Sequence, residues 1–154
     1  MAWNQTARRD DRQSSWRVGL FHCLIVSEDA ARRAVFQQGA LEGGWETIVC
    51  TNVGSARRVA DRSLFQLAIV DMIAAGGQRP ARFDLLVEQL AGLDNVLSIV
   101  CGNDANVQEE IWVRQMGAWL YLPGGISTDG MIAMCSEARQ VAQRLHAPGE
   151  SSLS

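Results

Sequence analysis

The chain has 154 residues, of which 47% are hydrophobic and 20% charged, with a formal net charge of -3. This length and balance predict one globular domain with a sizeable core. The slightly acidic charge gives no basic surface for direct binding to nucleic acid. No apolar run approaches the roughly 18 residues that a membrane span needs, and the first residues lack the apolar core of a secretory signal. We therefore expect a cytoplasmic protein with no membrane segment.

Both ends of the chain differ in composition from the middle. Residues 1–17 are mostly polar, and residues 147–154 are rich in Ser, Pro and Gly. Such segments rarely contribute to a packed core. We expect a flexible N-terminal extension over 1–17, one domain over 18–146 and a flexible tail over 147–154.

Five short apolar runs alternate with longer segments that have helical spacing. The runs cover residues 19–26, 45–50, 64–70, 95–101 and 119–122. Several are near-continuous Val, Ile and Leu, as expected of strands that are buried on both faces. Segments with helical spacing cover residues 30–41, 81–92, 106–116 and 131–145. The alternation predicts a doubly wound α/β domain with five parallel strands and five helices.

Polar residues at the strand ends are the candidates for function, because the crevice of such a sheet lies beyond the carboxyl ends of its strands. The first strand ends in Ser27-Glu28-Asp29 and the third in Asp71. If these strands are neighbours, their acids face one another, and clustered carboxylates suit a hard cation such as Mg²⁺. The same acids also fit a simpler interpretation, as turn formers and helix N-terminal residues.

Helix starts can also be predicted from capping residues. Asn103 or Asp104 suits the N-cap of the helix over 106–116, and Ser127 or Thr128 suits that of the last helix.

Three motifs together resemble the receiver domain of two-component response regulators. They are the acidic end of LIVSED (24–29), the aspartate of LAIVDM (67–72), and GAWLYL (117–122). Their spacing also matches that family, and the resemblance covers about residues 19–145. It implies a flavodoxin-like (βα)5 fold with five parallel strands in the order 2-1-3-4-5.

The resemblance implies roles for the acids. Asp71 falls on the phospho-acceptor aspartate, and Glu28, Asp29 and Asp71 form the candidate Mg²⁺ site. In that chemistry the aspartate attacks phosphorus while Mg²⁺ neutralises the charge on the phosphoryl oxygens. Mg²⁺ is the only cofactor that we expect, and we do not expect an enzyme.

The other positions that surround the acceptor aspartate in this family depart from the family pattern. Ser27 replaces the first acid, Cys101 replaces a hydroxyl residue at the end of the fourth strand, and Pro123 follows the fifth strand without the expected lysine. The sequence contains no lysine. Arg79 is a candidate replacement cation, and an exposed loop arginine is the simpler interpretation. These departures predict an atypical or pseudo-receiver with weak or no switching by phosphorylation.

The resemblance also implies switch and partner positions. Cys101 and Tyr121 fall on the two switch positions, and a thiol is a poor hydrogen-bond donor. Trp112 and Trp119 fall on or near the face by which family members dimerise, and large aromatic residues are enriched at binding hot spots. Core packing is the alternative interpretation of both tryptophans.

The leading functional prediction is a stand-alone receiver-like signalling domain that contacts a signalling protein or histidine kinase and forms a homodimer. One alternative is a functional response regulator that is phosphorylated at Asp71 with Mg²⁺. The other is a flavodoxin-like small-molecule or redox module that uses Cys101. The four cysteines have no CxxC spacing and sit in apolar segments, which favours buried reduced thiols.

Overall fold

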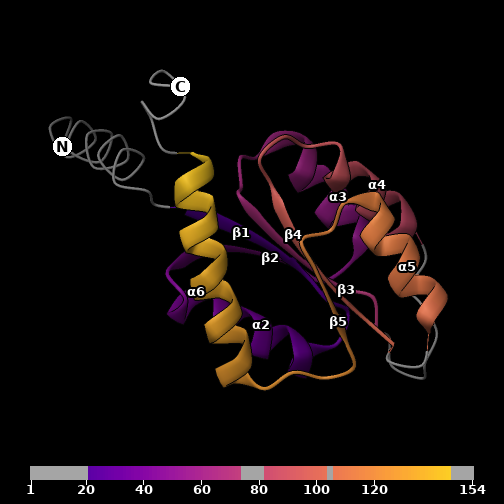
Figure 1. Cartoon of the computed structure of the whole chain (residues 1–154), viewed down its shortest axis with the longest axis horizontal. Coiled ribbons are helices and arrows are strands. Elements are labelled where there is room, and N and C mark those ends of the chain that lie inside the picture. Colours follow the sequence, from indigo (N-terminus) through magenta and orange to yellow (C-terminus); the bar gives the residue numbers. More distant parts are fainter. Residues whose placement is uncertain (1–20, 74–81, 104–105, 147–154) are drawn as a thin grey trace, which may run out of the picture.

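The computed structural model describes residues 21–73, 82–103 and 106–146. Strands and helices alternate along these residues, and Figure 1 shows them in their arrangement in space. The elements are β1 (Phe21–Val26), α2 (Ala30–Glu42), β2 (Trp45–Cys50), α3 (Val53–Arg62), β3 (Leu67–Asp71), α4 (Phe83–Ala91), β4 (Leu97–Gly102), α5 (Val107–Met116), β5 (Leu120–Pro123) and α6 (Thr128–Leu145).

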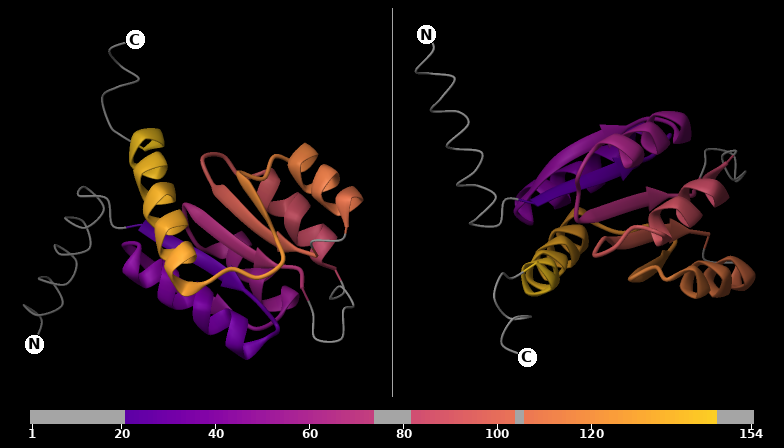
Figure 2. Two further views of the ribbon diagram at one scale, coloured as in Figure 1. Left: turned by 60° about the horizontal axis from the view of Figure 1, so that its bottom comes forward. Right: turned by 90° about the horizontal axis from the view of Figure 1, so that it is seen from above.

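The five strands form one parallel sheet in the order β2-β1-β3-β4-β5. Helices α2 and α6 cover one face of this sheet, and α3, α4 and α5 cover the other (Figures 1 and 2). The doubly wound, flavodoxin-like fold and its strand order are therefore confirmed. Because β1 lies beside β3, the ends of these two strands meet at one edge of the sheet.

Two hydrophobic cores form because successive side chains of a strand point to opposite faces. Cys23 and Ile25 pack with α2 and α6, whereas Leu24 and Val26 pack with the three helices of the other face. All five residues of β3 are buried. A strand covered on both faces has no solvent side, which explains its continuous apolar sequence.

Strand boundaries differ from the predicted ones by a few residues. The third and fourth strands begin at Leu67 and Leu97 rather than at 64 and 95. Asn95 has a left-handed backbone with φ of 60°, which interrupts an extended strand. At the other end, Asp71 belongs to β3 and pairs in register with Cys101. The candidate carboxylate is therefore held by the sheet itself.

One helix, α3, was not among the predicted helical segments, and one N-cap prediction was wrong. The buried residues of α3, which are Val53, Ala56 and Ala60, do have helical spacing, but two of them are small and most of the other residues of the helix are polar. Helix α5 is capped by Asn106, whose side chain accepts a hydrogen bond from the Glu109 amide, rather than by Asn103 or Asp104. The alternative cap at Ser127 is confirmed for α6.

Helices α2 and α6 approach each other closely because glycine faces a side chain of α6 at two positions. A Cβ on Gly39 would overlap the side chain of Met131, and a Cβ on Gly43 would lie 2.6 Å from the Cβ of Cys135. The indole N–H of Trp45 then donates to the Cys135 carbonyl at 2.9 Å. This hydrogen bond joins β2 to α6, and the close approach at Gly39 and Gly43 places α2 against α6.

The predicted extensions over 1–17 and 147–154 lie outside the described residues, as does Arg79. Among the helices that the structure describes, none is long and apolar enough to cross a membrane.

Candidate functional site

Asp71 lies at the carboxyl end of β3 and is fully buried, with 0% of its surface exposed. Arg32 binds it with two hydrogen bonds, from Nε to Oδ2 at 2.8 Å and from Nη2 to Oδ1 at 3.1 Å. The hydroxyl of Ser27 donates to Oδ2 at 2.8 Å, and the backbone N–H of Ile73 donates to Oδ1 at 3.1 Å. Both carboxylate oxygens are therefore engaged by donors of the chain itself.

Local structure explains how Arg32 and Ser27 reach the acid. Ser27 follows β1, whose last residue pairs in register with Val70, so its side chain lies next to Asp71. Asp29 is the N-cap of α2, and its Oδ1 accepts from the Arg32 backbone N–H at 2.9 Å. Arg32 is thereby fixed in the first helical turn, with its guanidinium 5.5 Å from the centre of the Phe36 ring.

Charge pairing dominates the electrostatics of this cluster. Burial on its own lowers the pKa of Arg32, but the hydrogen bond and the charge of Asp71 outweigh it, so that the pKa is raised overall. Arg32 is 23% exposed at its side chain. A bidentate arginine–carboxylate pair is stronger and more directional than a single hydrogen bond. The negative charge of Asp71 in the crevice is therefore balanced by the positive charge of Arg32.

The sequence carries a signal for Arg32, which was not among the predicted site residues. The positive end of the helix dipole disfavours cations in a first turn, and α2 has no acid there. An arginine at that position needs a partner, and Asp71 is that partner. Above the pair lies a hollow of about 280 Å³, lined by Arg32, Ile73, Asn103, Gly124 and Gly125.

Cys101 lies beside Asp71 at the end of β4 and has no exposed surface. Burial is the largest cause of a rise in the pKa of its thiol to about 12, and the charge of Asp71 adds to it. A protonated thiol is a poor nucleophile. This geometry does not support the predicted redox use of Cys101.

Tyr121 is buried in β5, and its hydroxyl points toward α5. It donates to Oε1 of Glu109 at 2.9 Å and lies 3.3 Å from the carbonyl oxygen of Asn103. The tyrosine at the predicted switch position therefore donates to a carboxylate.

Comparison with known proteins supports the assignment of the fold. No family model matches the sequence, and no curated protein matches it. Solved structures do match. A CheY-like receiver domain from Methanospirillum hungatei is 18% identical, with a TM-score of 0.69 over 82% of this chain and 98% of that chain. The receiver domain of a LuxO-type repressor from Vibrio parahaemolyticus is 16% identical, with a TM-score of 0.69 over 82% and 95%.

A third similar structure contains a phosphorylated aspartate. It is a response regulator from Burkholderia pseudomallei, which contains a phosphorylated aspartic acid, a calcium ion and citrate. It is 15% identical, with a TM-score of 0.61 over 84% of this chain and 75% of that chain.

This chain has the receiver fold.

The predicted metal ligands of this receiver fold do not come together. Glu28 is exposed, Asp29 caps α2, and Asp71 is bound by Arg32. Within the described residues, no group of three or more His, Cys, Asp or Glu side chains could hold a metal ion. A guanidinium lies against the carboxylate that a divalent cation would need. The residues present therefore do not fit the predicted Mg²⁺ site.

The two candidate partner tryptophans are half-buried on opposite faces of the sheet. Trp112 packs against the core beneath α3, α4 and α5, whereas Trp119 packs against the core beneath α2 and α6. They do not form one aromatic patch. The exposed apolar residues of α5 are instead Val107 and Ile111, which are 65% and 46% exposed.

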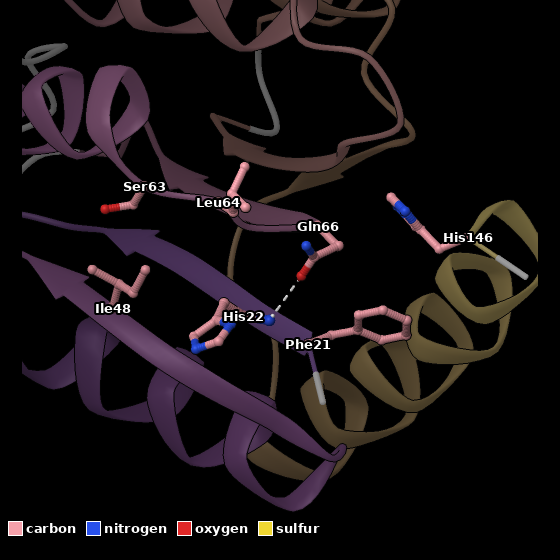
Figure 3. A pocket seen from close by; sticks show the side chains of 7 residues that line it. All are labelled: Phe21, His22, Ile48, Ser63, Leu64, Gln66 and His146. Carbon is pink, nitrogen blue, oxygen red and sulfur yellow. Dashed lines mark hydrogen bonds between the residues drawn. The ribbon is translucent and has the colours of Figure 1, made fainter. Parts of the chain in front are cut away.

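A second hollow lies at the opposite end of the sheet (Figure 3). Its volume is about 780 Å³, and its lining residues are Phe21, His22, Ile48, Ser63, Leu64, Gln66 and His146. The backbone N–H of His22 donates to the side-chain oxygen of Gln66 at 2.9 Å. Both histidines of the sequence line it, and none of the lining residues in the described part of the chain is an acid.

We expect Cys101 to resist alkylation in the folded protein. Iodoacetamide at neutral pH should label Cys101 far more slowly than the same thiol in urea, because the folded thiol stays protonated until the pH approaches about 12. Peptide mass spectrometry of native and urea-treated samples checks this, with the three other cysteines as internal references. Rapid native labelling confined to Cys101 would restore the redox interpretation.

Proposed function

We propose that this protein is a receiver-like signalling domain that acts by protein contact and switches weakly or not at all by phosphorylation. One observation carries the proposal: the buried carboxylate of Asp71 is bound by Arg32 and Ser27. The domain is then a non-enzymatic regulatory module of a two-component-type pathway inside the cell, and Asp71 serves as a structural ion-pair partner.

Phosphoryl transfer makes demands that this ion pair opposes. The attacking oxygen needs a free lone pair in line with phosphorus, and metal ions normally neutralise the developing charge. Here each oxygen of Asp71 accepts two hydrogen bonds, and the neighbouring cation belongs to the chain. Phosphorylation would require Arg32 to leave a buried partner. This argument favours the proposal over a functional regulator phosphorylated at Asp71.

The proposed partner face is the outer surface of α5. Val107 and Ile111 are one turn apart, so their exposed side chains lie on the same side of the helix. Trp112 contributes from the half-buried edge of this helix. Apolar side chains rimmed by the exposed Glu110–Arg114 pair suit contact with another signalling protein or a kinase. Homodimer formation stays a prediction.

The decisive experiment offers the protein a small phosphodonor. Incubation with Mg²⁺ and acetyl phosphate should produce no phosphoryl mass gain in intact-protein mass spectrometry. Beryllofluoride with Mg²⁺ should likewise cause no saturable change in tryptophan fluorescence. A response regulator that accepts acetyl phosphate serves as the positive control for the reagents. A mass gain that disappears in Asp71→Asn would instead establish a functional phospho-acceptor.

A further inference from the structure

Glu109 is a buried acid that takes no part in the ion pair between Arg32 and Asp71. Among the described residues, the buried polar or charged side chains are Ser27, Asp71 and Glu109. The first two contact each other in the crevice, whereas Glu109 lies on the first turn of α5 and is 7% exposed. A carboxylate is rarely buried without specific hydrogen bonds, because desolvation is costly. The hydrogen bonds of Glu109 must therefore offset that cost.

The contacts of Glu109 tie three elements together. Its Oε1 accepts from the Tyr121 hydroxyl of β5 at 2.9 Å and from the Asn103 backbone N–H, after β4, at 3.3 Å. Its own backbone N–H is held by the Asn106 cap at 2.9 Å. The acid therefore has a fixed backbone position, and its side chain spans from α5 to the hydroxyl of a buried tyrosine. A hydrogen bond to a charged group is stronger than one between neutral groups.

Gly102 provides the space for this contact. It is the last residue of β4, and a Cβ placed there would overlap both the Tyr121 hydroxyl and Oε1 of Glu109. Any larger residue at this position would push one of the two groups out of place. The glycine, the acid and the tyrosine thus form one arrangement that depends on all three.

We propose that Glu109 and Tyr121 form a brace that holds the tyrosine inside the unmodified domain. The brace acts from α5, without any contribution from the carboxylate of Asp71, and it keeps the region of α5 and β5 in one conformation. The role of this brace in signalling rests on the proposed function. In that function, the brace would present the partner face on α5 in one constant form.

The test uses the fact that Tyr121 is the only tyrosine of the chain. Biosynthetic incorporation of 3-fluorotyrosine gives a ¹⁹F signal from this one site. The change in its chemical shift between H₂O and D₂O measures the exposure of the ring to solvent. In the unmodified protein we expect the small solvent-isotope shift of a buried ring, without any phosphodonor present.

Matched variants separate the brace from general packing. In Glu109→Ala the ratio of buried to solvent-exposed tyrosine ring should fall roughly 10- to 100-fold, as expected for loss of a hydrogen bond to a charged group. Glu109→Gln keeps an acceptor oxygen and should retain the buried ring. Gly102→Ala should expose the ring, whereas Gly92→Ala, at a site with room for a Cβ, should not.

The exposure of the Tyr121 ring in these variants tests the brace whether or not Asp71 can be phosphorylated. An exposed ring in the unmodified protein, or an unchanged isotope shift in Glu109→Ala, would overturn the brace. If Gly102→Ala does not fold, the comparison of Glu109→Ala with Glu109→Gln still decides. Beryllofluoride binding at Asp71 would contradict the proposed function and leave the dependence of Tyr121 on Glu109 intact, so the two failures can be distinguished.

Discussion

Replacing Arg32 by alanine is expected to lower the free energy of unfolding by about 3 kcal/mol, near the lower end of the range for breaking a buried ion pair. The change leaves the carboxylate of Asp71 buried without its cation, whereas the partial exposure of Arg32 reduces the effect. Ser27 and the Ile73 amide remain as donors but carry no charge. Urea denaturation followed by tryptophan fluorescence measures the difference.

Two further variants identify the source of that loss. Arg114→Ala removes an arginine from the exposed pair with Glu110 and should change stability by less than about 0.5 kcal/mol. The double variant Arg32→Ala with Asp71→Ala removes both charges and should lose clearly less stability than the sum of the single variants. Strict additivity would show that the pair contributes no coupling, and the structural role proposed for Asp71 would then be wrong.

Replacing Gly39 by alanine is expected to cost about 2 kcal/mol, within the usual range for overpacking. The new Cβ overlaps the side chain of Met131 and lies 3.1 Å from its carbonyl carbon, so rotation of the methionine alone cannot relieve it. Helix α2 would have to move away from α6. Such a movement also displaces the first turn that carries Arg32, and thermal or urea unfolding measures its cost.

The matched control for Gly39→Ala is another helical glycine. Gly54 lies in α3, where a Cβ would have its nearest contact at 3.4 Å, from the Asn52 side chain. Gly54→Ala should be neutral or slightly stabilising, because alanine has the higher helix propensity. If Gly39→Ala behaved like this control, the close packing of α2 on α6 would not limit stability.

The fold class and the place of the acid follow from the pattern of residues alone. Runs such as residues 67–70 have no polar face, and a strand of that kind is stable only when helices cover both sides of its sheet. Alternation with amphipathic segments then leads to the doubly wound arrangement. The aspartate that ends such a run must lie at the carboxyl edge, where Asp71 is found.

The contacts of this aspartate depend instead on how distant elements pack together. Arg32 and Asp71 are 39 residues apart, and their pairing depends on β1 lying beside β3 and on the turn by which Asp29 begins α2. No periodicity or composition specifies such a contact. The same holds for Glu109 and Tyr121, because their hydrogen bond requires the bare backbone of Gly102 between two elements. Local pattern fixes which face of an element is buried, whereas the partner of a buried polar group depends on where distant elements are brought together.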